Sequence, residues 1–400
     1  MQEIRRRLQR GTLNAGKTGI SGTPGFEEDF TLDPTDNWTN YLTKVAGTTV
    51  LNQSRTQNKA NELLTLSGSS ALLGYNANGD LTRSPKPADW TTAYDYTWDA
   101  WDRLVKVVDH STSAVVATYA YDARDRRITK TTSLVRHYYY TDTWQVLEER
   151  TGSNTTPDRQ FVWGLRSIDD LVLRDRSTER LYAFHDVFHC TAIGDTTGTV
   201  KERYGYDAYG NPRVMDASFN VLSGSSYDWE TRYADGRWDG ETGLDPMRYR
   251  YLHPKLGGWL TRDPLEYWAG NNLYAYVLDA PVNTIDPLGL QATGPGESPP
   301  ASKPAHTRPR TLPPRCHQSP SPGPPNNEPD PNIRRALPYL DRNGSGHGPF
   351  YWQVGGSVHQ GGGGSVWSGP GYGRPNMPQN PYTHNPWQPK PSPWPQDNPQ

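Results

Sequence analysis

Two aspartates in one tyrosine-rich stretch have the residue type and spacing of a catalytic acid pair. The stretch RDPLEYWAGNNLYAYVLDAPVNTIDPLGL spans residues 262–290 and contains Asp263 and Asp286, 23 positions apart. A return of the chain through NNLYAYV would bring the two carboxyl groups near each other. Carboxylates in contact can share one proton, because like charges push their pKa values apart, and such a pair can activate water against a peptide bond. Arg262 would then polarise the carbonyl group or stabilise the developing oxyanion.

A structural alternative explains the same two aspartates. Asp-Pro is a common way to open a turn, because the aspartate accepts hydrogen bonds from nearby backbone N–H groups and the proline fixes φ. Asp263 and Asp286 each precede a proline. Their spacing is therefore compatible with catalysis and with two turns, and the residues alone leave both interpretations open.

Two other clusters of polar residues are candidate sites. HDVFHC places His185, His189 and Cys190 in an aromatic and β-branched context that predicts a strand. Residues four apart on a strand lie about 13 Å from each other, too far to share one ion, so no metal site is predicted. Asp169 and Asp170 in SIDDLVLRD are interpreted as a hairpin turn or a solvated face rather than an acid pair.

The last hundred residues contain further candidates. GGGGS at 361–365 is followed by no Lys-Ser/Thr pair and no helix pattern, so it is not predicted to bind phosphate. His347 and His359, with Arg334 and Arg335, would resemble a nuclease set if they converged. No motif joins them, and we interpret them as solvated polar residues. No cofactor and no metal are expected.

Composition points to β structure. Only 33% of the 400 residues are hydrophobic, yet 14 are Trp and 24 are Tyr, against 7 Phe. Such side chains suit half-buried sheets, where one face of the aromatic ring packs against apolar neighbours and its polar group forms a hydrogen bond. The net charge of −2 gives no general attraction to nucleic acid or to anionic membranes.

The sequence also limits the possible compartments. Two cysteines exclude a disulfide framework, and no run of 18 apolar residues is long enough for a membrane span. The basic start lacks the apolar region of a secretory signal peptide. The sequence does not determine the localisation, and it leaves open export or display at the cell surface as part of a larger protein.

Short repeats fix the expected architecture. The unit aromatic-x-aromatic-Asp, followed by a polar turn and a β-branched run, occurs in YTWDAWDRLVKVV from Tyr96, YAYDARDRRITKT from Tyr119 and YGYDAYGNPRVMD from Tyr204. GYNANGDLTRS from Gly74 is a shorter version. Alternating aromatics form one face of a strand and the Asp-led turn reverses it, so each unit predicts a hairpin. Such hairpins must stack on neighbours, which predicts an extended, curled antiparallel sheet with little helix.

These repeats resemble the RHS/YD-repeat proteins, and the segment GETGLDPMRYRYLHPKLGGWLTRDPLEYWAGNNLYAYVLDAPVNTIDPLGL at 240–290 resembles their C-terminal RHS repeat-associated core. The resemblance covers roughly residues 70–290. It implies a shell of YD repeats sealed by the core and followed by a variable C-terminal domain, often a toxin. In several members of the family the core cuts the chain just after the DPxGL-like sequence, which implies cleavage between Leu290 and Gln291.

The chain also departs from the family pattern. Asp245-Pro246 stands where paired tyrosines are usual, and His253 stands where Tyr or Asp is common. The repeats are too few to close a shell, which indicates the C-terminal end of a longer protein or a gene fragment.

Proline marks a change of composition after Leu290. The segment 291–400 contains 25 of the 36 prolines and few aliphatic residues, which predicts a largely disordered, Pro/Gly-rich extension. The expected regions are N-terminal partial repeats, the YD-repeat sheet, the core, and the variable extension, at 1–69, 70–239, 240–290 and 291–400.

Two functions follow from the resemblance. The first is a structural carrier or cap for the extension. The second is a single-turnover aspartyl self-protease that cuts after Leu290, with no external substrate expected. The implied partners are the remainder of an RHS shell or a partner shell protein, and an immunity protein if the extension is toxic.

Overall fold

The computed structural model describes residues 4–69, 73–268 and 270–294. Every described residue belongs to one unit of the chain, Met1–Pro309. Residues 295–400 lie outside the described residues. They include all but the first four residues of the extension predicted to be largely disordered, and the candidates at Arg334, Arg335, His347, His359 and 361–365.

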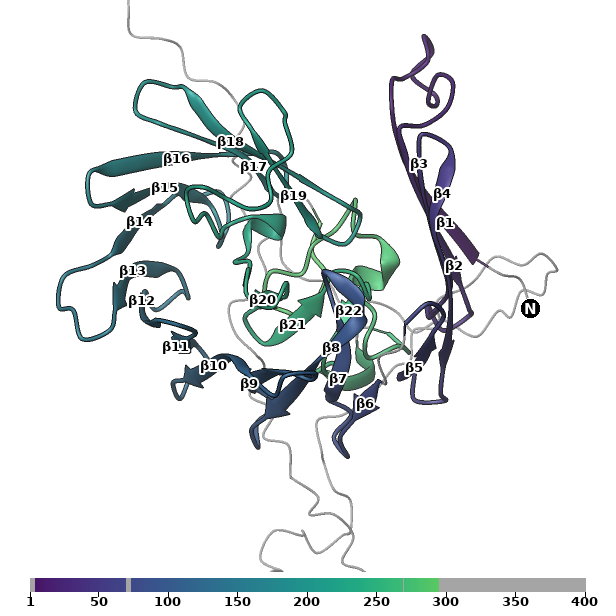
Figure 1. Ribbon diagram of the computed structural model, residues 1–400, viewed down its shortest axis with the longest axis horizontal. Helices are drawn as coiled ribbons and strands as arrows, with labels where there is room; N and C mark the ends of the chain where they lie inside the picture. Colours follow the sequence, from purple (N-terminus) through teal and green to yellow (C-terminus); the bar gives the residue numbers. More distant parts are fainter. Residues whose placement is uncertain (1–3, 70–72, 269, 295–400) are drawn as a thin grey trace, which may run out of the picture. The chain divides into compact units, whose positions relative to one another are not determined.

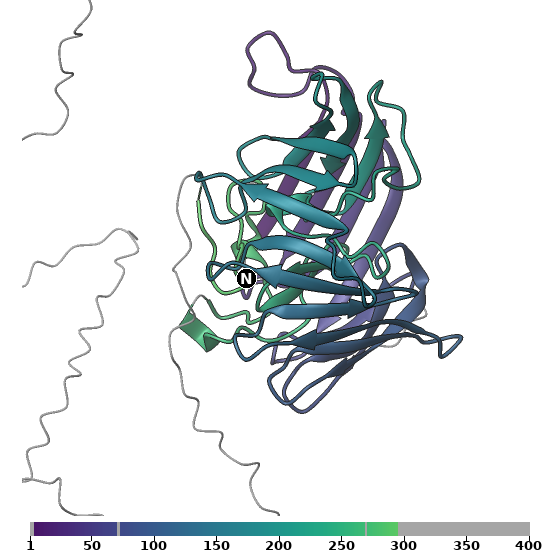
Figure 2. The ribbon, with the colours of Figure 1, turned by 90° about the vertical axis from the view of Figure 1, so that its left-hand side faces the viewer.

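The predicted antiparallel β architecture is confirmed. The largest sheet has fourteen strands in the order in which they occur in the chain, so each strand pairs with its sequence neighbours. Figure 1 shows this sheet curling through β6 to β19, and Figure 2 shows its strands stacked side by side. Its strands are β6 (Gly74–Tyr75), β7 (Leu81–Lys86), β8 (Asp89–Trp98), β9 (Leu104–Asp109), β10 (Val115–Tyr121), β11 (Arg127–Thr131), β12 (Val135–Tyr140), β13 (Val146–Thr151), β14 (Arg159–Trp163), β15 (Leu171–Arg176), β16 (Glu179–His185), β17 (Cys190–Gly194), β18 (Val200–Tyr206) and β19 (Pro212–Asp216).

Two smaller sheets complete the described fold. The N-terminal sheet has five antiparallel strands, and a three-stranded sheet lies in residues 245–259. The only helical elements among the described residues are three-residue 3₁₀ turns at Tyr233–Asp235, Glu266–Trp268 and Val277–Asp279. The remaining strands are β1 (Ile4–Arg10), β2 (Phe26–Leu32), β3 (Trp38–Val45), β4 (Thr48–Gln57), β5 (Leu63–Leu66), β20 (Asp245–Met247), β21 (Arg250–His253) and β22 (Gly258–Trp259).

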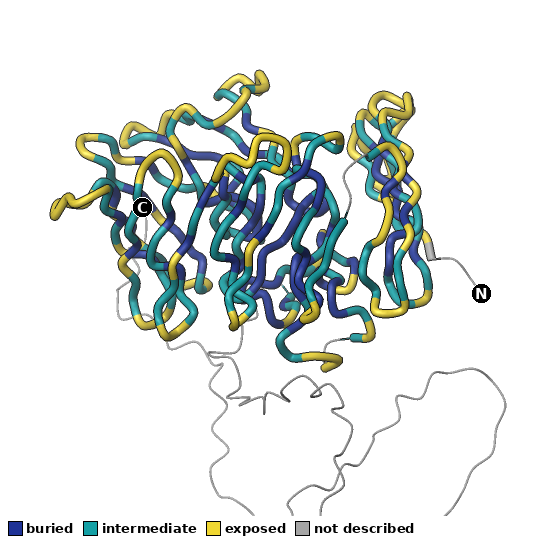
Figure 3. The backbone as a smooth tube through the Cα atoms, turned by 60° about the horizontal axis from the view of Figure 1, so that its bottom comes forward, coloured by how far each residue is buried: buried dark blue, intermediate teal, exposed yellow. Residues whose placement is uncertain are grey.

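The repeat motif forms hairpins because its aspartate closes the turn between two strands. In each unit the aspartate after the aromatic pair accepts backbone N–H bonds two and four residues ahead, which closes a tight turn. Asp99 Oδ1, for example, accepts from Trp101 N at 2.8 Å and from Arg103 N at 3.1 Å, and Asp122 and Asp207 form the same contacts. Figure 3 shows the result, with buried residues along the strands and exposed turns at their ends.

The core-like segment, residues 240–290, lies on the concave side of the curled sheet (Figure 1). We call this segment the cap. Its aromatic residues Trp259 and Tyr276 belong to one buried cluster with Trp38 of the N-terminal sheet and Tyr204 of the curled sheet. The cap is therefore part of the same hydrophobic core as both larger sheets.

Residues 228–241, which we call the crossing segment, attach to the inner face of the sheet through buried charges. Asp239 accepts from Arg127 Nη2 at 2.9 Å and from Lys130 Nζ at 3.0 Å, and both cations belong to β11. All three side chains are buried. Removing one partner of such a group leaves an uncompensated buried charge, so these contacts fix the position of the segment.

His253, one of the departures from the family pattern, is a buried structural residue. Its Nε2 lies 3.0 Å from Pro85 O, and its Nδ1 accepts from Leu256 N at 3.1 Å. One nitrogen must donate and the other accept, so the imidazole is neutral. Burial lowers the pKa of His253 to about 4, and the charges of Arg55 and Lys255 act in the same direction.

We expect His253 to make stability depend on pH. The pKa of His253 in the folded state, about 4, lies below its value of about 6.5 in the unfolded state. The stability that the neutral imidazole provides is therefore fully present above pH 6.5 and is lost as the pH falls toward 4, and the loss amounts to about 3 kcal/mol. His253→Gln keeps an N–H donor without the titration. Between neutral and mildly acid pH, the free energy of unfolding measured with denaturant should therefore fall more for the wild type than for the variant. Parallel pH profiles for the two chains would show that His253 does not titrate on unfolding.

Candidate functional site

The two aspartates of the predicted acid pair meet on one guanidinium group. Asp263 Oδ2 lies 3.1 Å and Asp286 Oδ2 lies 3.2 Å from the same atom, Arg250 Nη2. All three side chains are buried. The structure thus brings together two carboxylates that are distant in sequence and places a cation against both.

Asp263 is positioned by the cap. Its backbone N–H donates to Leu273 O at 3.0 Å, which fixes the chain beside the returning segment. Its Oδ1 accepts from Leu265 N at 2.7 Å, and its carbonyl accepts from Glu266 N at 2.9 Å. These are the contacts of an Asp-Pro turn, so Asp263 has the structural role that the alternative interpretation describes.

Asp286 holds the backbone at the predicted cleavage point. Its Oδ1 accepts from Leu290 N at 2.9 Å and from Gln291 N at 3.1 Å. Leu290 is 1% exposed, whereas Gln291 is exposed. The border between the cap and the extension therefore runs from a buried residue directly to an exposed one.

Gly289 and Arg250 complete this border. Gly289 has φ +69°, and a Cβ at this position would lie 2.5 Å from Met247 O and 2.9 Å from Arg250 N. Only glycine fits such a close approach with a left-handed backbone. Arg250 Nε donates to Gly289 O at 2.5 Å. One arginine therefore binds both carboxylates and the backbone of the DPLGL turn.

The chain stays attached beyond the predicted cleavage point. Ile285 N donates to Thr293 O at 3.1 Å, and Thr293 N donates to Ile285 O at 2.7 Å. This antiparallel bridge closes a loop around residues 286–292. If the Leu290–Gln291 bond broke, these contacts would still connect the two products.

Burial and charge act in opposite directions at the acid pair. Burial raises the pKa of Asp263, the Arg250 guanidinium lowers it, and the charge of Asp286 raises it further. Burial also lowers the pKa of Arg250, although both carboxylates oppose that shift. The Arg250 guanidinium lies over the Trp259 ring, 4.2 Å from its centroid, which adds a cation–π contact.

Arg262, the predicted electrophilic residue, contacts other groups. Its Nη2 lies 2.8 Å from Glu62 Oε1, and its Nε donates to Tyr274 OH at 3.2 Å. The cation that contacts Asp263 and Asp286 is Arg250, a residue that was not predicted from the sequence. A signal was present, since Arg250 is a charged residue in the otherwise aromatic and apolar run YRYLH.

HDVFHC does not form one continuous strand, and that prediction was wrong. Strand β16 ends at His185 and β17 begins at Cys190, because Asp186 Oδ1 accepts from Phe188 N and His189 N and reverses the chain. His185 Nδ1 lies 2.6 Å from Asp235 Oδ1, and Cys190 is buried. No group of three or more potential metal ligands occurs within the described ranges.

Asp169 and Asp170 do not form an acid pair with each other. Asp169 Oδ1 lies 2.7 Å from Arg248 Nη2, and Asp170 Oδ1 accepts from Arg166 Nε at 2.9 Å. Gly164 N donates to Asp170 O at 2.6 Å, which closes a turn between β14 and β15. The prediction of a hairpin turn is therefore confirmed for Asp170, while Asp169 connects that turn to the cap.

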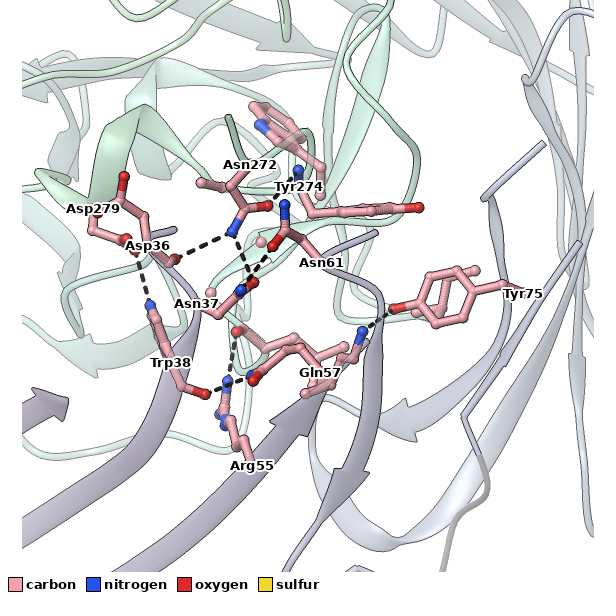
Figure 4. Close-up of a pocket in the computed structure, with 17 residues that line it drawn as sticks. Asp36, Asn37, Trp38, Arg55, Gln57, Asn61, Tyr75, Asn272, Tyr274 and Asp279 are labelled. Carbon is pink, nitrogen blue, oxygen red and sulfur yellow. Dashed lines mark hydrogen bonds between the residues drawn. The ribbon is translucent and has the colours of Figure 1, made fainter. Parts of the chain in front are cut away.

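A pocket of about 70 Å³ lies between the N-terminal sheet and the cap (Figure 4). Trp38 Nε1 donates to Asp279 Oδ1 at 2.9 Å across it, and Asn272 Nδ2 donates to Asn37 Oδ1 at 2.9 Å. Arg55 lies over the Trp38 ring at 4.5 Å. These groups bind one another, so the contacts across the pocket join the N-terminal sheet to the cap.

Comparisons with known proteins agree with this architecture. Residues 98–134 match the family described as RHS Repeat. The chain is 32% identical over 223 residues to the tRNA nuclease WapA of Bacillus subtilis, which covers 54% of this chain and 9% of that protein. It is 27% identical over 246 residues to double-stranded DNA deaminase toxin A of Burkholderia cenocepacia, covering 54% of this chain and 16% of that protein.

Two further comparisons found a toxin with a similar sequence and a solved structure with a similar fold. The chain is 48% identical over 52 residues to toxin protein Tse5 of Pseudomonas aeruginosa, covering 13% of this chain and 4% of that protein. The crystal structure of TcdB2-TccC3-TEV matches with a TM-score of 0.51 and 18% identity, covering 72% of this chain and 15% of that one, and shows a shared fold. The chain thus spans a small part of each of these proteins. No helix among the described residues is long and apolar enough to cross a membrane.

Proposed function

The chain is an RHS/YD-repeat protein related to bacterial polymorphic toxins, and on this premise we propose that it is a structural carrier. Residues 240–290 would be the closing cap of an RHS shell, residues 70–239 its YD-repeat wall, and residues 1–69 partial repeats that precede the wall. The cap would present the extension, residues 291–400, as variable cargo.

The observation that carries this proposal is the anchoring of the chain at residues 289–291. Asp286 accepts the N–H groups of Leu290 and Gln291, and Arg250 binds both Asp286 and Gly289 O. A carrier needs such a fixed end, because the cargo that follows it varies while the cap keeps one fold.

The relatives support a carrier in a second way. WapA and the Burkholderia deaminase toxin are named for different reactions, yet each matches 54% of this chain. Proteins named for different reactions thus each resemble about half of this chain, which suits a carrier whose cargo varies. Any toxic activity of this chain would then belong to the extension, and an immunity protein would be its partner.

The shell itself needs further chains or repeats. The described curled sheet is open, with β6 and β19 at its two edges. Unpaired edges accept additional strands, so the remainder of an RHS shell or a partner shell protein is the expected neighbour.

A truncated chain tests the carrier proposal. If residues after Gly294 are cargo, a chain that ends at Gly294 should unfold with the same apparent Tm as the full chain, as measured by tryptophan fluorescence. A chain that ends at Leu288 loses the contacts of Gly289, Leu290 and Thr293, and should unfold at a lower temperature. A large loss of stability in the Gly294 chain would show that the extension belongs to the folded core and would overturn the proposal.

A second function is single-turnover self-cleavage after Leu290, and one contact favours it. The amide nitrogen of Gln291, which would become the leaving amine, is the nitrogen that donates to Asp286 Oδ1. Water would add to the Leu290 carbonyl and lose a proton to the ionised carboxylate, and the Gln291 nitrogen would gain the proton held by the other carboxyl group as the peptide bond breaks. Arg250 lowers the pKa of Asp263 and so opposes the protonated carboxyl group that this step needs, and we therefore favour the carrier function.

A further inference from the structure

A pocket rich in aromatic side chains lies where the ends of strands β10 to β14 meet the crossing segment and the cap. Its volume is about 80 Å³. We call it the aromatic pocket. The lining residues that bear on its ligand are Tyr140, Trp144 and Trp163 of the curled sheet, and Pro246, Met247 and Pro287 of the cap.

The aromatic pocket offers apolar contact rather than charge. Trp163 Nε1 donates to Val146 O at 2.7 Å, and Tyr140 OH donates to Arg127 O at 2.8 Å, so these polar groups already have partners. Both residues are only half-buried, which leaves part of each side chain open to contact. The charged side chains around the pocket are paired, as in Arg248–Asp169, Arg127–Asp239, Arg237–Glu230 and Asp235–His185. The pocket therefore suits a small apolar group that packs against aromatic rings.

Trp144 occupies a turn position that favours glycine. Its φ is +71°, whereas the equivalent position of three other repeat turns is glycine, at Gly79, Gly198 and Gly210. A bulky residue with a left-handed backbone is an outlier, and such outliers persist where the side chain has a task. The Trp144 ring packs on Tyr249 of the cap, 5.1 Å between centroids, and it also lines the pocket. The turn thus tolerates strain in order to place an aromatic ring at this pocket.

The chain leaves the cap close to the aromatic pocket. Pro287 lines the pocket, and Ile285, two positions before it, exchanges both backbone hydrogen bonds with Thr293. Such a pair places the two Cα atoms about 5.5 Å apart, and each residue of an extended chain spans at most about 3.6 Å. The Cα atom of Gly294 therefore lies within about 17 Å of the Cα atom of Pro287.

The sequence that follows Gly294 contains groups that match the pocket. It reads PGESPPASKP from Pro295 to Pro304, with a proline pair at Pro299 and Pro300. In the polyproline conformation a chain advances about 3.1 Å per residue, so about six residues cover the distance from Gly294 to Pro287. Proline-rich segments bind to aromatic-lined grooves, because their fixed φ lowers the entropy lost on binding. The proline pair is therefore within reach of the pocket and has the chemistry to fill it.

We propose that the aromatic pocket binds the pair Pro299-Pro300, which packs against the rings of Trp144 and Trp163. This contact goes beyond the carrier function, which needs a fixed end at residues 289–291 and no further contact with the extension. It would set the direction in which the extension leaves the cap. Two proline rings bury little surface, so the docking is reversible and leaves the apparent Tm close to that of a chain that ends at Gly294.

Photocrosslinking in the full chain tests the docking. Ser302→benzoylphenylalanine places a photoreactive ketone two positions after the proline pair. After irradiation, digestion and mass spectrometry, we expect crosslinks to the lining residues of the aromatic pocket, Met247 among them. Crosslinks confined to other parts of the chain, or to a second copy of it, would overturn the proposal.

Proline variants separate docking from mere proximity. In the photoreactive chain, Pro299→Ser combined with Pro300→Ser should lower the yield of pocket crosslinks about tenfold, because the packed rings are lost. Pro313→Ser combined with Pro314→Ser changes a second proline pair of the extension and should leave the yield unchanged. An undiminished yield after the first pair of substitutions would show that the short connection alone produces the crosslinks, and docking would be refuted.

A variant of the pocket provides the complementary test. Trp144→Gly suits a φ of +71°, so the turn should form as before while the ring is removed and the crosslink yield falls. Trp101→Gly removes a tryptophan that is 70% exposed and lies outside the pocket lining, so it should have no effect on the yield. Equal yields for these two variants would contradict the assignment of Trp144. The truncation at Gly294 tests the carrier function separately, since its outcome does not depend on where the extension docks.

Discussion

Replacing Arg250 with methionine is expected to lower the free energy of unfolding by about 3 to 5 kcal/mol. Methionine fills similar volume but leaves Asp263 and Asp286 buried, close together and without their cation. It also removes the donor that binds Gly289 O. The loss should appear as a lower midpoint of denaturant unfolding monitored by tryptophan fluorescence.

Two controls make this result specific. Adding Asp263→Asn to Arg250→Met removes one of the uncompensated charges and should restore part of the lost stability. Arg262→Met removes a cation whose side chain is 36% exposed and which pairs with Glu62, so it should cost less than about 1 kcal/mol. Equal losses for Arg250→Met and Arg262→Met would contradict the role assigned to Arg250.

If the acid pair is catalytic, a purified wild-type preparation will contain a fragment whose N-terminus is Gln291. Asp263→Asn keeps the turn-forming geometry but cannot share a proton, so this variant should stay at full length with its fold intact. N-terminal sequencing and denaturing intact-mass measurement give the result directly. Denaturing conditions are needed because the Ile285–Thr293 bridge would otherwise hold the products together.

The pH dependence of cleavage gives a second readout. A shared proton is needed, and the pKa of Asp263 is raised by burial, so cleavage should proceed at mildly acid pH and slow as pH rises above the higher pKa of the pair. Asp286→Asn should block cleavage in the same way as Asp263→Asn. A wild-type chain that keeps its full mass after prolonged incubation at acid pH would eliminate the self-cleavage function and leave the carrier function.

The hairpins of this fold could be predicted because their signal is local. The aspartates at 99, 122 and 207 each bond to backbone two and four residues ahead, so the motif contains its own turn. The turn in HDVFHC has the same cause, since Asp186 bonds to Phe188 N and His189 N. It was missed because the flanking aromatic and β-branched residues favour a strand.

The parts that could not be predicted depend on long-range contacts. Arg250 reaches Asp286 across 36 positions, and Arg127 reaches Asp239 across 112. No local pattern specifies which buried cation meets which carboxylate, because that choice depends on how the sheet curls. The proximity of Asp263 and Asp286 was predicted from the return of the chain between them, whereas the arginine between their carboxylates was not.

Limited proteolysis of the full chain, followed by intact-mass measurement of the resistant fragment, tests the central proposal most directly. The carrier account predicts that the extension is removed first, leaving a stable fragment that ends shortly after Leu290 and keeps residues 240–290. Early cuts within residues 240–290, or an extension that resists proteolysis as strongly as the cap, would contradict it.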